Sequence, residues 1–265
     1  MTTPEPPKEK RSSKKTLYIV LGAIVAFGAI IGIGQVFINQ NSTPLRAEAE
    51  TPAAQATTEE PQGAPSASES PVAAPGKVSA EDSPLALRDP DDYAALGAVD
   101  APLVLIEWTD LRCPFCAAFT NDTFPTITKE YIDSGKVRLE VAPIAMFGDQ
   151  SFDAAVATHA AGEQGMFFEY LRTVYAAAPE GGKPDLTREV LLSFAEQAGI
   201  PNIEQFTTDL DSPELHKKVS DETAFARQIG VNSVPFFVAG EVSLPGAQSI
   251  ETFREYLDHF DIDGK

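Results

Sequence analysis

The chain has few of the residues that build metal centres or disulfide scaffolds. Only two of its 265 residues are cysteine, and only three are histidine. A structural zinc site needs about four such ligands, and small exported scaffolds are stapled by several cysteine pairs. We therefore expect no metal site and no network of structural disulfides.

Positive charge is also scarce. Lysine and arginine together number 20, against 39 aspartate and glutamate residues, which leaves a net charge of −19. So acidic a chain repels nucleic acid and anionic lipid headgroups, and we expect neither to bind its folded part. The excess of negative charge instead favours solubility in an external medium.

Large apolar side chains are nearly missing from residues 39–84, which are rich in Ala, Pro, Ser, Thr and Glu. A segment of this composition cannot bury enough apolar surface to fold. We therefore expect residues 39–85 to form a disordered extracytoplasmic linker that joins a folded domain to whatever precedes it.

The chain before this linker contains a long uncharged run. Leu17–Ile38 has 22 residues without a charge, which as a helix would be about 33 Å long and could cross a hydrocarbon core of about 30 Å. Five basic residues precede the run, and only Arg46 follows it closely. The positive-inside rule then predicts a cytoplasmic tail at 1–16, a single-pass signal anchor in the cell membrane, and the remainder outside. A secretory signal cleaved near Ala47–Ala49 is the alternative, although its apolar core would be unusually long.

The two cysteines lie three positions apart, in the segment Cys113-Pro114-Phe115-Cys116. An apolar run precedes this segment and a helical pattern follows it. Residues at this spacing in the first turn of a helix lie about 5 to 6 Å apart, within the range that a disulfide tolerates. The pair could therefore form and break a disulfide with little backbone movement, which predicts a redox-active site that needs no other cofactor. A purely structural disulfide is the alternative, although so short a loop would remove little chain entropy.

The two thiols should have different roles. Cys113 would lie at a helix N-terminus, where unpaired N–H groups and the helix dipole favour a thiolate, so we expect it to be the nucleophile. Pro114 suits the first helical position, because its missing N–H costs nothing there. Cys116 would be the resolving thiol, which attacks the mixed disulfide between Cys113 and a substrate.

Glu107 is a charged residue inside the apolar run, six positions before Cys113. We expect this carboxyl group to lie buried beneath the helix, where desolvation raises its pKa. There it could accept or release the proton of the resolving thiol. The alternative is a glutamate at the end of a strand that reaches solvent.

The first half of the folded part reads as a strand, a helix and a second strand. Leu103–Trp108 lacks alternation, which is typical of a buried strand with parallel neighbours, and Val137–Val141 reads as its partner. The helix between them should begin at Cys113 and kink near Asn121, because Pro125 cannot donate a backbone hydrogen bond.

The second half reads as a run of helices and then a hairpin. Val234–Ala239 and Val242–Leu244 are the two expected hairpin strands, and Pro235 should open the first of them. Helical spacing and Gly or Pro punctuation predict the helices, which we expect at 151–162, 166–178, 187–198, 203–210, 213–229 and 249–259.

This order of elements is similar to the thioredoxin fold as elaborated in the DsbA family of thiol-disulfide oxidoreductases. The resemblance covers about residues 97–260 and rests on the two cysteines, on Glu107, on the large insertion and on Val234-Pro235. It implies an α/β thioredoxin-like domain at 86–265 with a helical insertion at about 151–229. With the expected membrane anchor and acidic linker, the chain looks like the membrane-anchored DsbA-like enzymes of actinobacteria and other Gram-positive bacteria.

The resemblance also implies roles for residues near the cysteines. Pro235 should follow a cis peptide bond beside them, and the backbone of Val234 should pair with an extended substrate segment. We expect Pro114 and Phe115 to contact the substrate as well. The best-known DsbA has His where this chain has Phe115, and Phe cannot help to stabilise a thiolate. We therefore expect a pKa of Cys113 that is lowered, but less than in DsbA, and a less oxidising couple.

The function that this resemblance implies is the introduction of disulfides into exported proteins that carry reduced cysteine pairs. A quinone-linked membrane partner of the DsbB or VKOR type would then reoxidise the enzyme. A disulfide isomerase, a membrane-tethered thiol reductase and a non-catalytic chaperone are the alternatives. Isomerases that resemble DsbC carry a folded dimerisation module, and the linker offers none, so we expect a monomeric catalytic domain.

Overall fold

The computed structural model of this protein describes residues 79–80 and 82–263. The expected tail at 1–16, the expected span at Leu17–Ile38 and most of the expected linker lie outside these residues. Within the part of the chain that is described, no helix is long and apolar enough to cross a membrane.

The described residues form a five-stranded sheet with the strand order β1-β3-β2-β4-β5. The central strand β2 runs parallel to β3 and antiparallel to β4. The expectation of parallel neighbours is thus correct on one side of β2 and wrong on the other, because the chain enters β4 from the helical insertion in the opposite direction. The strands are β1 (Ala95–Leu96), β2 (Leu103–Thr109), β3 (Val137–Pro143), β4 (Phe236–Ala239) and β5 (Val242–Pro245).

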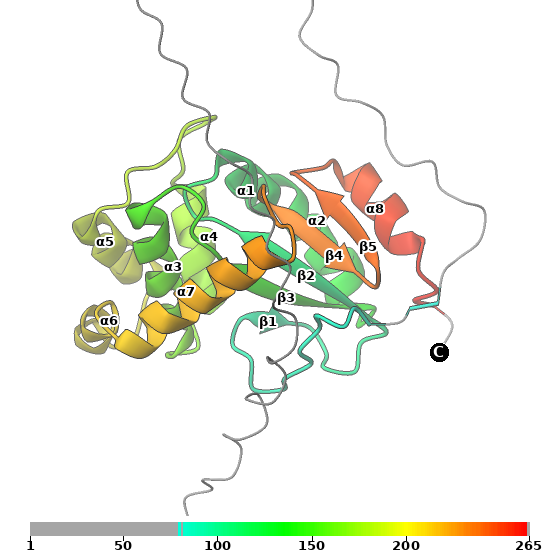
Figure 1. The fold of residues 1–265 in the computed structure, drawn as a ribbon, viewed down its shortest axis with the longest axis horizontal. Coiled ribbons are helices and arrows are strands. Elements are labelled where there is room, and N and C mark those ends of the chain that lie inside the picture. Colours follow the sequence, from blue (N-terminus) through cyan, green and yellow to red (C-terminus); the bar gives the residue numbers. More distant parts are fainter. Residues whose placement is uncertain (1–78, 81, 264–265) are drawn as a thin grey trace, which may run out of the picture. The chain divides into compact units, whose positions relative to one another are not determined.

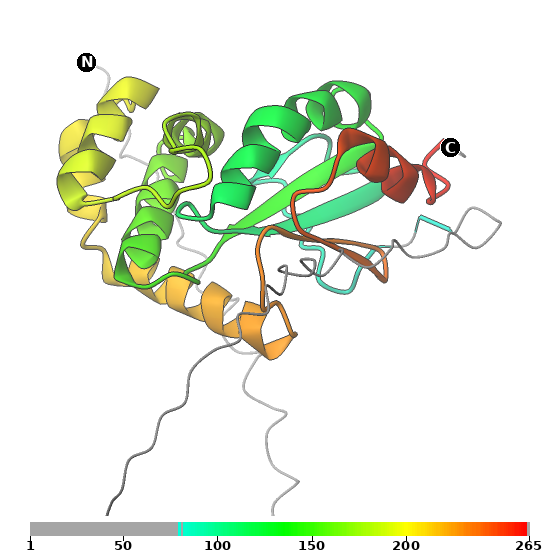
Figure 2. The same cartoon turned by 90° about the horizontal axis from the view of Figure 1, so that it is seen from above.

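Every residue of β2 is buried, as the lack of alternation in Leu103–Trp108 predicts. Alternation places Leu105, Glu107 and Thr109 on one face of the sheet. Glu107 is paired with Phe237 of β4, whose ring lies 4.6 Å from the ring of Phe119 in the cysteine-bearing helix. Glu107 and Thr109 therefore face the layer that holds the cysteines. Figures 1 and 2 show the helix of this layer on one side of the sheet.

The cysteine-bearing helix is interrupted twice by π-helical turns. It consists of α1 (Pro114–Ala118), η1 (Phe119–Thr123), α2 (Phe124–Ile127) and η2 (Thr128–Ile132). The first irregular turn lies where the kink was predicted, because Pro125 has no N–H to donate to the carbonyl of Asn121. The second π-helical turn was not predicted.

Five helices lie between β3 and β4, close to the predicted bounds. They form a group beside one end of the sheet, and α7 returns from this group along the face opposite α1 (Figures 1 and 2). Thr187, Ser212 and Ser249 cap three helices by accepting backbone N–H groups of the first turn. The helices are α3 (Asp149–Gly162), α4 (Phe167–Ala176), α5 (Arg188–Ala198), α6 (Ile203–Asp209) and α7 (Pro213–Gln228), followed after the hairpin by α8 (Ile250–Asp258).

The segment that enters the domain is fastened to β3 by a buried carboxylate. Glu140 accepts hydrogen bonds from the backbone N–H groups of Leu87 and Arg88, both at 2.8 Å. The same carboxylate forms a buried ion pair with Arg138, at 3.0 Å. The charge of Glu140 is thus compensated by two N–H groups and one guanidinium group, which offsets the cost of burying this carboxylate.

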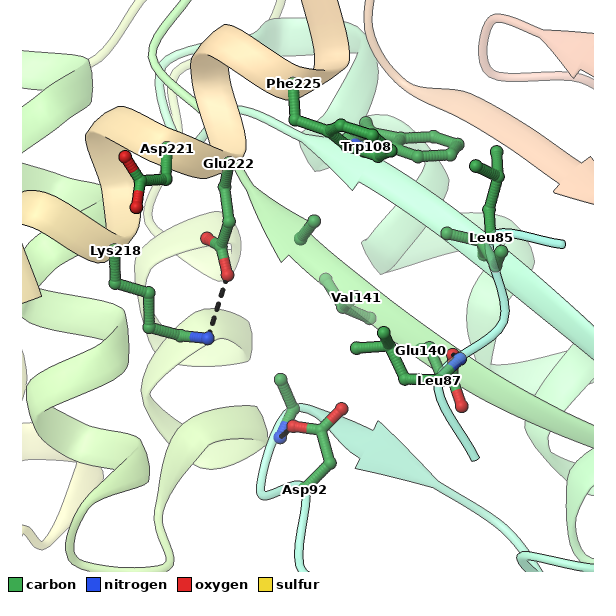
Figure 3. Close-up of a pocket in the computed structure, with 13 residues that line it drawn as sticks. Leu85, Leu87, Asp92, Trp108, Glu140, Val141, Lys218, Asp221, Glu222 and Phe225 are labelled. Atoms are coloured by element: carbon green, nitrogen blue, oxygen red, sulfur yellow. Dashed lines mark hydrogen bonds and ion pairs between the residues drawn. The ribbon is translucent and has the colours of Figure 1, made fainter. Parts of the chain in front are cut away.

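A pocket of about 300 Å³ opens between this entry segment, the sheet and α7. Trp108 and Val141 line it from the sheet, Leu87 and Phe225 from its two sides, and the ion pair of Lys218 with Glu222 closes one end (Figure 3). Because Trp108 and Glu107 point to opposite faces of β2, the pocket lies across the sheet from the cysteine layer.

Candidate active site

Cys113 and Cys116 are free thiols and are almost completely buried, with 2% and 0% of their surface exposed. Cys113 occupies the N-cap position of α1 in an extended conformation, and Pro114 is the first helical residue, as predicted. Cys116 lies one turn further along the same helix. The sequence thus positions two sulfurs at the start of a helix that packs on the centre of the sheet.

The turn before Cys113 is organised by Asp110, a buried residue to which the sequence analysis assigned no role. Its carboxylate accepts the N–H of Arg112 at 2.8 Å and the N–H of Met146 at 2.7 Å. Its carbonyl accepts the N–H of Cys113 at 2.9 Å. Asp110 therefore ties the cysteine turn to the loop that follows β3.

Hydrogen bonds lower the pKa of Cys113 from its ordinary value of 9.0 to about 7. The largest contribution comes from the side chain of Cys116, and the backbone N–H groups of Cys116 and Phe115 add to it. Burial and the nearby charge of Asp110 oppose this effect. Cys113 is thus acidic because of donors from its own helical turn, as the N-terminal position predicts.

The pKa of Cys116 moves in the other direction, well above its ordinary value. Burial is the main cause, and the hydrogen bond to Cys113 and the charge of that thiolate contribute further. Above about pH 7, where Cys113 has ionised, the proton that remains on the pair therefore belongs to Cys116. Such an asymmetric pair has one ready nucleophile and one thiol that needs a base.

Glu107 lies buried beneath the cysteine helix, with 4% of its surface exposed. Desolvation raises its pKa from 4.5 to about 8, against a hydrogen bond with Thr109 that lowers it. The alternative of a solvent-exposed glutamate is therefore wrong, because the apolar run that carries Glu107 is covered on both faces. A carboxyl group of this pKa can both give and take a proton near neutral pH.

The loop before β4 brings Val234 and Pro235 to the cysteines. The Val234–Pro235 peptide bond is cis, as the resemblance implies. The thiol of Cys113 donates a hydrogen bond to the carbonyl of Val234 at 3.4 Å, across 121 positions of sequence. Pro235 directly precedes β4 rather than opening it, because the ladder begins at Phe236.

Two apolar side chains reach the surface beside the buried sulfurs. Phe115 exposes 65% of its surface at the tip of α1, although it is a large aromatic residue. Pro114 next to it is partly exposed. Exposed apolar side chains beside a reactive group are suited to contact a partner molecule.

Two polar residues near Cys116, Thr109 and Tyr175, were not predicted from the sequence. Thr109 follows the predicted strand by one residue and shares the face of Glu107, so alternation alone could have singled it out. Tyr175 comes from α4 in the insertion, and its hydroxyl lies 2.7 Å from that of Thr109. No local pattern signals that contact. Among the described residues, no group of three or more His, Cys, Asp or Glu side chains is close enough to hold a metal ion.

The chain resembles known proteins over the same residues that carry this site. Residues 90–259 match the family model described as Thioredoxin. The probable disulfide bond formation protein D of Bacillus anthracis is 30% identical over 162 residues, which are 59% of this chain and 74% of that protein.

Solved structures share the fold. The oxidised BdbD from Bacillus subtilis superposes with a TM-score of 0.59 at 21% identity, over 64% of this chain and 93% of that one. The DsbA of Chlamydia trachomatis superposes with a TM-score of 0.54 at 21% identity, over 62% of this chain and 89% of that one. Because the family model spans more than half of the sequence, and because 74% of a 30% identical disulfide bond formation protein is matched, the chain belongs to the thioredoxin family and to its disulfide bond formation proteins.

Proposed function

We propose that this DsbA-like protein disulfide oxidoreductase uses Cys113 and Cys116 to introduce disulfide bonds into exported proteins. The observation that carries the proposal is the asymmetry of the two thiols, with the pKa of Cys113 lowered to about 7 and that of Cys116 raised. An acidic Cys113 is a good leaving group when a client takes over the disulfide. The similarity to a probable disulfide bond formation protein supports the same reaction.

The proposed reaction consists of two thiol-disulfide exchanges. A client thiolate attacks the sulfur of Cys113 in the Cys113–Cys116 disulfide, and Cys116 leaves and takes a proton. A second client thiolate then attacks the client sulfur of the mixed disulfide and releases Cys113 as a thiolate. The client loses two electrons and gains a disulfide, while the enzyme gains both electrons and becomes a dithiol.

Four residues around the sulfurs would hold the client. We assign the backbone of Val234 to pairing with an extended client segment, because its carbonyl already lies against the thiol of Cys113. Pro235 keeps this carbonyl turned toward the helix. Pro114 and Phe115 would contact the client's side chains, since they form the exposed apolar rim.

The location of the reaction follows from the first part of the sequence. In this proposal Leu17–Ile38 anchors the protein in the cell membrane, and residues 39–85 link the anchor to the extracytoplasmic domain. A membrane partner of the DsbB or VKOR type would reoxidise the dithiol. Extraction of membranes with alkaline carbonate tests the anchor, because a spanning protein stays in the pellet and a cleaved one is released.

The oxidase is tested with the purified full chain and a reduced ribonuclease-type enzyme as the client. The oxidised protein should restore the client's activity, whereas Cys113→Ser should not. A wild-type protein that fails at every ratio of reduced to oxidised glutathione would contradict the proposal. Mass spectrometry of clients trapped on Cys116→Ser would then identify natural substrates.

Three alternatives make different predictions. A reductase should have a redox potential near that of thioredoxin, about −270 mV, whereas an oxidase should lie closer to about −120 mV. An isomerase should reactivate a scrambled client faster than it oxidises a reduced one. A chaperone should remain active as Cys113→Ser.

A further inference from the structure

The pocket between the entry segment, the sheet and α7 takes no part in the reaction proposed above, because it lies across the sheet from the cysteines. Its walls are mainly apolar. Ile106 and Val141 line it from the sheet, Leu87 from the entry segment and Phe225 from α7, and the indole of Trp108 lies among them (Figure 3). A hollow of about 300 Å³ is at the lower end of the range for ligand sites, and it has room for a large apolar side chain.

Two of these walls are exposed to an unusual degree. Leu87 exposes 72% of its surface and Phe225 exposes 44%. A group of large apolar side chains on a surface is typical of a place where another molecule binds. A small ligand inside the pocket would leave the outer parts of both side chains in water, whereas a polypeptide would cover them. The walls therefore favour a peptide segment over a small molecule.

Acidic groups outnumber basic ones around the pocket. Among the described residues that line it, four carry a carboxylate and one carries an ammonium group. Three of the four carboxylates already have a cationic partner: Glu140 pairs with Arg138, Glu222 with Lys218, and Asp221 with Lys217.

Asp92 is the fourth carboxylate, and it forms no ion pair within the part of the chain that is described. Its Oδ1 atom accepts the N–H of Ala94 at 2.9 Å, and its Oδ2 atom has no partner among the same residues. Asp92 is half-buried, and Figure 3 shows its carboxylate pointing into the space between α7 and Leu87. A carboxylate beside apolar walls attracts a cation more strongly than one in open water, because the local dielectric constant is lower. The pocket thus combines apolar walls with one unpaired negative charge.

We propose that this pocket is a second binding site for client proteins, and that it takes a segment in which a large aliphatic side chain lies next to a lysine or arginine. The aliphatic side chain packs against Trp108 between Leu87 and Phe225, and the cation pairs with Asp92. Only the identification of the partner as a client rests on the function proposed above. The binding of such a segment does not.

A second site would act by keeping the client close to the cysteines. A chain that is held at the pocket presents its own cysteines to Cys113 at a high effective concentration. The gain lies in binding, because the pocket touches neither sulfur. An extended client can reach both faces of the sheet at once, and the site therefore favours long unfolded chains over short peptides.

Trp108 gives a direct report of what enters the pocket, because it is the only tryptophan of the chain. We would titrate the purified full chain with a peptide of about 12 residues that has Leu-Lys-Leu at its centre and no cysteine or aromatic residue. The Trp108 emission should change and reach saturation, and calorimetry gives the Kd. Ala in place of both Leu residues should weaken binding at least about tenfold, and Glu in place of Lys several-fold.

Variants of the pocket should reproduce these losses. Phe225→Ala should weaken binding about tenfold, because one apolar wall is removed. Ile229→Ala is the matched control, since Ile229 is an exposed apolar residue one turn further along that does not line the pocket, and binding should not change. If Phe225→Ala does not fold, Leu87→Ala replaces it, because a side chain that is 72% exposed contributes little to the core.

The ion pair is tested by a double-mutant cycle. Asp92→Asn keeps the oxygen that accepts the N–H of Ala94 and removes the charge. It should weaken the Leu-Lys-Leu peptide about two- to fivefold, and it should leave a Leu-Gln-Leu peptide unaffected.

The effect on clients is measured with a reduced two-cysteine peptide that carries Leu-Lys-Leu after a Gly/Ser spacer of about 30 residues, whose r.m.s. length is about 27 to 33 Å. In single turnovers with an excess of the oxidised full chain, the enzyme concentration that gives half the maximal rate should be at least tenfold lower than for the spacer without Leu-Lys-Leu. The maximal rate should be the same for both. Phe225→Ala should remove the difference.

Several results would overturn the second site. These are an unchanged Trp108 emission, equal binding to wild type and Phe225→Ala, and equal binding of the Leu and Ala peptides. Binding that appears only in Lys77→Glu would mean that the chain's own linker fills the pocket, since Lys77 is the only basic residue between Arg46 and Arg88. An emission that changes on dilution of the protein alone would mean that a second copy fills it. If the peptide binds as expected but no client is oxidised, the function proposed above fails and the binding site stands.

Discussion

The pKa of Cys113 is lowered by the Cys116 thiol and by two backbone N–H groups of the same turn. Phe115 occupies the position where an imidazolium could have added a positive charge. The low pKa of Cys113 thus comes from backbone N–H dipoles and from one neutral thiol. These groups remain in position only while the helical turn keeps its conformation. The charge of Asp110 acts against these donors, which limits how acidic the sulfur becomes.

Removal of the Cys116 thiol should make Cys113 less acidic. In the wild type, the rate at which iodoacetamide alkylates Cys113 should rise with a midpoint near pH 7. In Cys116→Ala the midpoint should lie clearly higher, because the strongest donor is lost. Cys116→Ser is the matched control, since its hydroxyl can still donate. Equal midpoints in Cys116→Ala and the wild type would contradict this account.

Glu107 should make the reduced protein less stable as the pH rises. Its pKa is about 8 when folded and 4.5 ordinarily, so the folded state binds more protons than the unfolded state between these values. The free energy of unfolding should therefore fall from about pH 4.5 to about pH 8, by at most about 5 kcal/mol, and then level off. Urea titrations of the reduced protein at several pH values measure it. Glu107→Gln should flatten this dependence and be the more stable protein at pH 8.

At the scale of elements, β2 and the start of α1 could be predicted because their signals are local. The apolar run at Leu103–Trp108 and the spacing of the cysteines need no knowledge of the rest of the chain. β1 could not be predicted, because it is only two residues long and exists through its pairing with β3. Tyr175 was beyond prediction for a similar reason, since its contact with Thr109 spans 66 positions.

The entry segment and β3 depend on each other through Glu140. Glu140→Ala should lower the free energy of unfolding by about 3 to 5 kcal/mol, because it leaves Arg138 buried without its partner and two backbone N–H groups without an acceptor. Urea denaturation of the reduced protein measures the change. Glu130→Ala, which breaks the exposed ion pair with Arg254, should leave stability unchanged. An equal effect of both substitutions would contradict the role of Glu140.

At the scale of the whole molecule, the net charge of −19 sets how clients approach. Long-range attraction would favour basic segments over acidic ones, and salt would weaken this preference as the Debye length falls to about 10 Å at 0.1 M. The charge affects encounter, whereas the exchange itself takes place at buried sulfurs. A change in ionic strength should therefore alter the rate of association and leave the rate of the exchange step unchanged.

Exchange rates with cysteine peptides should show this separation. The second-order rate with an arginine-rich peptide should fall several-fold as salt rises from about 0.01 M to about 0.3 M. The rate with a glutamate-rich peptide of the same length should rise, and a neutral peptide should respond little. Stopped-flow mixing of the oxidised full chain with each peptide provides the measurement. Identical salt dependence for all three peptides would exclude steering by net charge.

Only 2% of Cys113 is exposed. This burial affects the stage of folding at which a client cysteine could react with it. A cysteine on a finished globular protein is held by its surroundings and cannot reach a recessed sulfur. In the proposed binding mode, a cysteine on a chain that is still extended would lie along the Val234 backbone and reach the sulfur. Under the proposed function, the protein would therefore act on polypeptides that are still unfolded, soon after their export.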